Sequence, residues 1–284
     1  IKNLAPSTPV VMITKNEEED IMDEALGSKI SDYLIKPVNP KQILLSIKKN
    51  IDTKRLVTEK TTSSYQSQFG QIGLQINQAA SFEDWVKIYT RLVYWEKEFE
   101  ESGTGGMEEV LRLQKSEANN EFARFIRSNY LHWFKGGSDT RPLVSPDVFT
   151  QKVFPMLDQN RVVVLVIDNL RYDQWKIIEQ EIAELFRTEE ETVFCSILPT
   201  ATQFARNAMF AGLMPGEIRE RYPQFWVDEN EEGGKNAFEE DLCMAQMQRL
   251  GIRASFHYEK INNQRAGKKL LERTADLLNF DLNI

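Results

Sequence analysis

The stretch Arg161-Val-Val-Val-Leu-Val-Ile-Asp168 decides the fold class of the second half of the chain. Every residue between Arg161 and Asp168 is apolar, and most are β-branched, which favours a strand. A strand without polar alternation is typical of a parallel sheet that is covered on both faces. We therefore expect a buried parallel strand that ends at Asp168.

Helix and strand signals alternate around this stretch. After it, the patterns predict helices at 174–186, at 238–250 and at 268–278, and a further helix that ends at Gly212. They also predict strands at 192–198 and 252–258 and a strand that begins at 280. The first fifty residues show the same alternation, with strands at 10–14 and 32–35 and helices at 17–26 and from Pro40, where Ile43, Leu44 and Ile47 form an apolar face. Such alternation predicts an α/β protein with parallel sheets.

The middle of the chain has a different pattern. Residues 52–68 are rich in Thr, Ser and Lys, which fits a linker or an exposed helix end. A capping box at Ser81 and Asp84 then precedes aromatic stripes at helical spacing, around Trp85 to Phe99 and Phe122 to Phe134, which predict a small helical bundle. His132 lies in the second stripe, where packing is a better interpretation than catalysis. The domains expected are 1–51, 52–155 and 156–284.

The composition excludes several classes of protein. A net charge of −8 and a pI near 5.1 argue against broad nonspecific binding to duplex nucleic acid. The longest apolar run, Val162 to Ile167, is too short to cross a bilayer. Cys195 and Cys243 lack the spacing of a disulfide framework or a thiolate zinc site. The chain begins without an initiator Met or a signal-peptide pattern, so we expect a cytoplasmic protein whose natural N-terminus lies further upstream.

Two polar positions follow predicted strands, at the sheet edge where ligands of α/β proteins gather. Asp168 is placed to hold a metal ion or, equally, to cap the following turn. Thr200 and Thr202 precede a helix, whose N-terminus attracts a phosphoryl group. Either threonine could be the helix N-cap, or one could be a nucleophile activated by a base or by a nearby Asp-bound zinc ion.

The motifs Val-Ile-Asp168-Asn-Leu-Arg-Tyr-Asp-Gln-Trp and Leu-Pro-Thr200-Ala-Thr202-Gln-Phe-Ala-Arg-Asn207 occur in this order. Together they resemble the PglZ branch of the alkaline phosphatase superfamily. The resemblance implies two zinc ions, with Asp168 as a ligand and Thr202 as both ligand and nucleophile. It places Arg206 or Asn207, one turn into the helix, near a nonbridging phosphate oxygen, although both also fit solvent-facing or packing positions.

The remaining zinc ligands of that superfamily have no counterpart in the sequence. They come as an Asp-x-x-x-His, an adjacent Asp-His pair and a late His, whereas His132 and His257 stand in other contexts. The resemblance therefore covers the N-terminal part of an alkaline-phosphatase-like α/β domain, and both ends of the chain are expected to cut through domains.

The first fifty residues, with Val-Val-Met-Ile-Thr14 and Ser-Asp-Tyr33-Leu-Ile-Lys36-Pro37, resemble the C-terminal part of a doubly wound, flavodoxin-like receiver domain. Thr14 and Lys36 match its switch hydroxyl and phosphate-binding lysine, and Tyr33 its aromatic switch position. A buried aspartyl phosphate needs such a cation and hydroxyl donor. The resemblance implies Mg²⁺ at the receiver site if the acidic residues of earlier strands are present.

The order of receiver, central helical bundle and PglZ-type domain resembles the PorX-type response regulators of type IX protein secretion. This implies a sensor histidine kinase, homodimerisation on phosphorylation, and contact with a sigma factor or a secretion-system component. It also implies phosphodiesterase action on cyclic or linear oligonucleotides. Two alternatives stay open: a noncatalytic dimerising and partner-binding switch, and a phosphomonoesterase or sulfatase. Thr202 argues against a sulfatase, which uses Cys or Ser.

Overall fold

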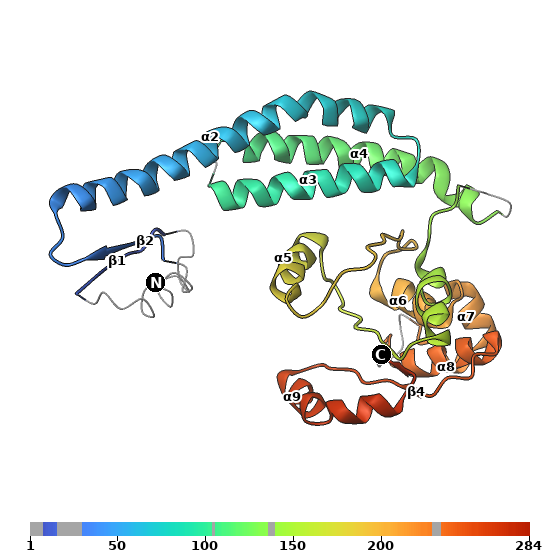
Figure 1. Cartoon of the computed structure of the whole chain (residues 1–284). Helices are drawn as coiled ribbons and strands as arrows, with labels where there is room; N and C mark the ends of the chain where they lie inside the picture. The colour runs from blue at the N-terminus through green and yellow to red at the C-terminus, as the bar shows by residue number, and fades with distance from the viewer. Residues whose placement is uncertain (1–7, 16–29, 104–105, 136–139, 229–233) are drawn as a thin grey trace. The chain divides into compact units, whose positions relative to one another are not determined.

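The structure, a computed structural model, describes residues 8–15, 30–103, 106–135, 140–228 and 234–284. The chain divides into two compact units, Ile1–His132 and Trp133–Ile284 (Figure 1). Each unit contains parallel β pairing together with helices, so the expected α/β class is confirmed. The helix predicted at 17–26 lies outside the described residues.

The first unit opens with a parallel pair of strands, β1 (Val11–Thr14) and β2 (Asp32–Ile35). Their register places Thr14 opposite Ile35. Helix α2 (Pro40–Gln78) follows, and Asn39 caps its start. The Asn39 side chain accepts from the Lys41 N–H at 2.9 Å, and the Gln42 side chain accepts from the Asn39 N–H at 3.2 Å. The capping box therefore fixes where the helix begins.

Helix α2 continues without a break through 52–68, so of the two alternatives the structure supports a helix, although this region is its middle and not its end. The reason lies on its inner face, where Tyr65, Ile72 and Ile76 are buried. The apolar face predicted near the start of α2 is exposed in the part of the chain that the structure describes, with Leu44 68% accessible.

Three helices, α2, α3 (Phe82–Ser102) and α4 (Glu108–Trp133), share one core in the first unit (Figure 1). Tyr65 is fully buried at its centre and packs edge-on against Trp95 and Phe99, with ring centroids 5.3 and 5.1 Å away. Its hydroxyl donates to Gln114 at 3.0 Å. The aromatic stripe of α3 is buried as predicted except at Tyr89, which is 46% exposed.

The second unit contains a three-stranded parallel sheet in the order β3-β5-β4. Its strands are β3 (Val162–Val163), β4 (Phe256–His257) and β5 (Leu282–Asn283). Its helices are α5 (Tyr172–Ile182), α6 (Thr202–Ala211), α7 (Pro215–Arg221), α8 (Glu239–Leu250) and α9 (Gln264–Glu272). Short 3-10 or π turns lie at η1 (Ser145–Asp147), η2 (Phe149–Val153), η3 (Phe154–Asp158), η4 (Pro223–Phe225) and η5 (Thr274–Asn279).

Three strand predictions in this unit need correction, and the strand expected at 252–258 is present only at Phe256–His257. The stretch from Arg161 to Asp168 forms a strand only at Val162–Val163, and Leu165 is 79% exposed rather than buried. Within the described residues β3 has a neighbour on one side only, β5, and the backbone hydrogen bonds to it end with that from the Val164 N–H to the Asn283 carbonyl at 2.8 Å. The strand expected at 192–198 is reduced to a single bridge between Val144 and Cys195.

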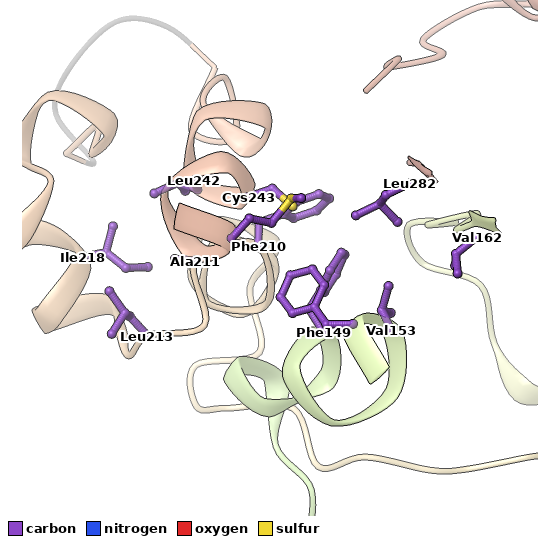
Figure 2. Close-up of a cluster of buried hydrophobic side chains, with 12 residues drawn as sticks. Phe149, Val153, Val162, Phe210, Ala211, Leu213, Ile218, Leu242, Cys243 and Leu282 are labelled. Atoms are coloured by element: carbon purple, nitrogen blue, oxygen red, sulfur yellow. The ribbon is translucent and has the colours of Figure 1, made fainter. Parts of the chain in front are cut away.

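The core of the second unit forms where α6, α7 and α8 meet η2 and β5 (Figure 2). Phe210, Ile218, Leu242 and Leu282 are each no more than 2% exposed. This core holds α6 and α8 against each other, and the candidate site lies at their N-terminal ends. Among the described residues, no helix combines the length and apolar character needed to cross a membrane.

Gly212 and Gly251 end α6 and α8 in left-handed conformation, with φ of 59° and 70°. A Cβ at Gly212 would lie 2.1 Å from the Gln246 amide nitrogen, whereas a Cβ at Gly251 would meet nothing within 4 Å. We predict that Gly251→Ala costs about 1–2 kcal/mol, the ordinary cost of a left-handed residue. Gly212→Ala should cost at least about 1 kcal/mol more, because the buried Gln246 side chain loses its hydrogen bond to Thr150. Urea unfolding of the two variants checks this, and equal losses would contradict it.

Both cysteine thiols are buried, and burial raises the pKa of Cys195 to about 11 and that of Cys243 to about 12. A raised thiol pKa keeps the protonated form in the folded protein, so the nucleophilic thiolate is scarce near neutral pH. We predict slow alkylation of both thiols by iodoacetamide in the native protein at pH 8, and fast alkylation in urea at the same pH. Rapid native alkylation of Cys195, read by mass spectrometry, would contradict this.

Candidate active site

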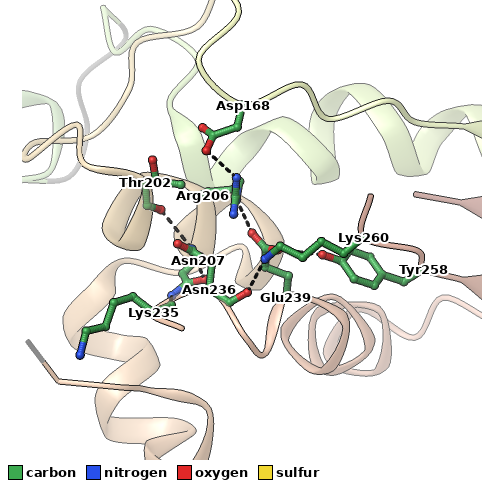
Figure 3. A network of polar contacts seen from close by, with 9 residues as sticks. All are labelled: Asp168, Thr202, Arg206, Asn207, Lys235, Asn236, Glu239, Tyr258 and Lys260. Carbon is green, nitrogen blue, oxygen red and sulfur yellow. Dashed lines mark hydrogen bonds and ion pairs between the residues drawn. The ribbon is translucent and has the colours of Figure 1, made fainter. Parts of the chain in front are cut away.

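The two sequence motifs meet through an ion pair between Asp168 and Arg206. Arg206 Nη1 lies 3.0 Å from Asp168 Oδ2 (Figure 3). The following helix α5 has Arg171 at its N-cap, without a side-chain cap bond, so Asp168 does not cap this helix. Asn169 instead turns the chain with a left-handed φ of 59°, a conformation that Asn tolerates. After this turn the Asp168 carboxylate points toward Arg206 and not toward the N-terminus of α5.

Thr202 is the first residue of α6, and Ala201 occupies the N-cap position without a side-chain cap bond. Neither Thr200 nor Thr202 therefore serves as the helix cap. Thr202 and Arg206 are four residues apart, which places their side chains on one face of α6. Among the described residues the Thr202 hydroxyl has no hydrogen-bond partner, while its carbonyl accepts from Asn236 at 3.2 Å.

Asn207 points in another direction from Arg206 and is 2% exposed. Its Nδ2 donates to the Lys235 carbonyl at 3.0 Å, and its Oδ1 accepts from Asn236 at 2.8 Å. Both ends of the amide are thus used to hold residues 235–236 against α6. The structure supports the packing alternative for this residue, and its role in binding substrate stays a prediction.

Glu239, the first residue of α8, is the central acceptor of the network in Figure 3. Its side chain is only 3% exposed and accepts from the Nε of Arg206 through Oε1. Its Oε2 accepts from the Tyr258 hydroxyl at 2.7 Å and from Lys260 Nζ at 2.8 Å. Burial, together with the hydrogen bond to Glu239, raises the pKa of Tyr258 above its ordinary range.

A cavity of about 620 Å³ opens beside this network. Asp168, Arg206, Tyr258 and Lys260 line its polar side. Its apolar side is formed by the exposed stretch after β3, by Phe210 of α6 and by leucines of α9 and η5. Three carboxylates, those of Asp168, Glu239 and Glu259, and two cations border this largely apolar wall, and each carboxylate is ion-paired. An anion can bind there at the N–H groups of the cations that these pairs leave unused.

Asp168 and Thr202 do not by themselves form a zinc site. Catalytic zinc sites in proteins use three protein ligands. Within the described residues no group of three His, Cys, Asp or Glu side chains is placed to hold a metal ion. The carboxylate of Asp168 is also already paired with Arg206. These residues alone therefore do not fit the pair of zinc ions that the resemblance implies.

The receiver positions Thr14 and Lys36 lie at the carboxyl ends of the parallel strands β1 and β2. The Lys36 N–H donates to the Thr14 carbonyl at 2.6 Å, so the two residues are adjacent. Lys36 also lines a surface hollow of about 690 Å³ with Ile13, Lys15 and Pro37. The contact joins the two backbones, and the signalling role of the two side chains stays a prediction.

Sequence reasoning missed Glu239, Tyr258, Lys260 and Asn236. Glu239 is an acidic residue in a first helical turn, which usually marks only a favourable helix dipole. The burial of Glu239 shows that it does more than interact with the helix dipole, and this burial cannot be read from the sequence. Of the two histidines, His132 is exposed, while His257 lines the cavity and stacks on Phe280 with ring centroids 5.1 Å apart.

Comparisons with known proteins agree with this architecture. Residues 55–134 match the family of the PorX response regulator linker domain, and residues 148–278 match the BREX system PglZ alkaline phosphatase-like domain. A segment of 73 residues is 36% identical to the transcriptional regulatory protein ZraR of Klebsiella oxytoca. This segment is 26% of the chain and 16% of that protein, so the likeness covers a small part of the relative. Together these matches identify the chain as that of a PorX-type response regulator with a PglZ domain, which is alkaline phosphatase-like.

Proposed function

We propose that the PglZ domain is a zinc-dependent phosphodiesterase effector that acts on cyclic or linear oligonucleotides under control of the receiver. The observation that carries this is the placement of Thr202, Arg206 and Asp168. Thr202 lies at the start of α6 with its hydroxyl unpaired among the described residues, and Arg206 one turn later reaches Asp168. A nucleophile beside an anion-binding side chain is the minimum that phosphoester cleavage needs.

The chemistry of Thr202 would follow the usual covalent route. Its hydroxyl loses a proton, its oxygen bonds to phosphorus, and the ester oxygen leaves on the opposite side and takes up a proton. Water then cleaves the phosphothreonine and restores the hydroxyl. The N–H groups at the start of α6 favour the negative charge of the phosphoryl group. A threonine hydroxyl needs activation at neutral pH, which the bound metal would supply with ligands beyond Asp168 and Thr202.

A noncatalytic switch is the second function, and two observations favour it. The described residues do not bring three metal ligands together, and Asp168 is engaged with Arg206. On this alternative the PglZ domain is a phosphorylation-controlled surface for dimerisation and partner binding.

The regulatory setting is also part of the proposal. A response regulator receives its phosphoryl group from a sensor histidine kinase, and Thr14 with Lys36 would read it, with Mg²⁺ at the receiver site. We propose a cytoplasmic protein that dimerises on phosphorylation and contacts a sigma factor or a component of type IX secretion.

The test is hydrolysis of bis(4-nitrophenyl) phosphate by the full-length protein in the presence of zinc. We expect Thr202→Ala to lower kcat by at least about a hundredfold, because a covalent route loses its nucleophile. Asp168→Ala should cause a comparable loss. Thr200→Ala is the matched control on the same turn and should keep most activity.

Circular dichroism and thermal unfolding establish that each variant is folded. If the wild type turns over the substrate and Thr202→Ala keeps that turnover, Thr202 is not the nucleophile. If wild type shows no zinc-dependent turnover at all, the noncatalytic switch is the better account.

A further inference from the structure

The buried carboxylate of Glu239 holds two cationic side chains from different parts of the second unit. Arg206 comes from α6, while Lys260 follows β4. Both contact Glu239, and Lys260 also donates to the Asn236 carbonyl at 2.8 Å. The Glu239 side chain is 3% exposed, so a ligand cannot contact it directly. Its effect on a ligand is to fix the positions of the two cations.

Both cations keep donors that the network does not use. A guanidinium has five N–H groups, of which Arg206 gives one to Glu239 and one to the exposed Asp168. An ammonium has three N–H groups, of which Lys260 gives two to Asn236 and Glu239. Arg206 and Lys260 both line the cavity of about 620 Å³.

Glu259 is the third carboxylate that lines the cavity, after Asp168 and Glu239, and it is engaged with other side chains. Glu259 is paired with Arg273 at 2.9 Å and lies 3.6 Å from His257. The Arg206 and Lys260 pair is therefore the part of the wall with unused positive donors, and Phe210, Leu270 and Leu277 provide the apolar surface next to it.

We propose that Arg206 and Lys260 form a phosphate subsite and that Glu239 is its positioning residue. The ligand class is a phosphoester whose organic group lies on the apolar wall. This deepens the proposed function and rests on it, since it names Lys260 and Glu239 as further residues of the same site.

The experiment measures binding and not turnover. Isothermal titration of the full chain uses inorganic phosphate and phenyl phosphate as probes, without added metal. We expect wild type to bind phenyl phosphate more tightly than phosphate, because the ring can contact the apolar wall. Lys260→Met should weaken both about tenfold or more, the effect of losing one charge-assisted hydrogen bond. Lys260→Arg should restore most of the affinity, and Lys268→Met, an exposed lysine on α9 outside the cavity, should change nothing.

The Glu239→Gln variant distinguishes a positioning role of Glu239 from a purely electrostatic effect of its negative charge on anion binding. Removal of a nearby negative charge by itself would tighten anion binding. If Glu239 positions the two cations, the folded variant should instead bind both probes more weakly. Tighter binding would overturn the positioning role, and unchanged binding in Lys260→Met, or no binding by wild type, would overturn the subsite. Binding without hydrolysis in the zinc assay would leave the subsite standing while the proposed catalysis fails.

Discussion

The second unit depends on one buried charge. A carboxylate taken out of water costs several kcal/mol unless it is paired and hydrogen-bonded. Glu239 meets this requirement with Arg206, Tyr258 and Lys260, which come from α6 and from the chain around β4. Because the three donors are far apart in sequence, the carboxylate ties α6, α8 and the sheet together at one point. The apolar core around Phe210 and Leu242 lies beneath the carboxylate and keeps water away from it, so the carboxylate needs these partners.

Local signals in the sequence predicted some helix ends well, but not those of α5 and α9, which were expected at 174–186 and 268–278 and lie at Tyr172–Ile182 and Gln264–Glu272. The N-cap at Asn39, the capping box at Ser81 and the glycines at 212 and 251 act within one helical turn, so their effect does not depend on distant residues. The continuous helix through 52–68 shows the limit of this reasoning. Its polar composition fits a linker as well as an exposed helix end, and the burial of Tyr65, Ile72 and Ile76 in the core is what makes it the middle of a long helix.

Strands were predicted less well, since a strand needs a partner that its own sequence does not contain. The apolar stretch after Arg161 has the composition of a buried strand, yet it pairs only where β5 runs beside it. In the site, Asp168, Thr202 and Arg206 were proposed from the sequence because they stand in recognisable motifs, and their functional roles stay predictions. Glu239 and Lys260 carry no motif, and only the folded arrangement reveals that a carboxylate at the start of α8 is buried between two cations.

Arg206 is shared between two carboxylates that differ in exposure, and this difference determines which contact can open. Asp168 is 56% exposed, so its pair with Arg206 lies in the range of about 0–1 kcal/mol that surface ion pairs contribute. The contact with Glu239 is buried, and breaking a buried pair costs about 3–5 kcal/mol. A ligand that competes for Arg206 would therefore displace Asp168 and leave Glu239 in place. The guanidinium then keeps its orientation while its outer N–H groups become available, so Asp168 can take another partner without loss of the subsite.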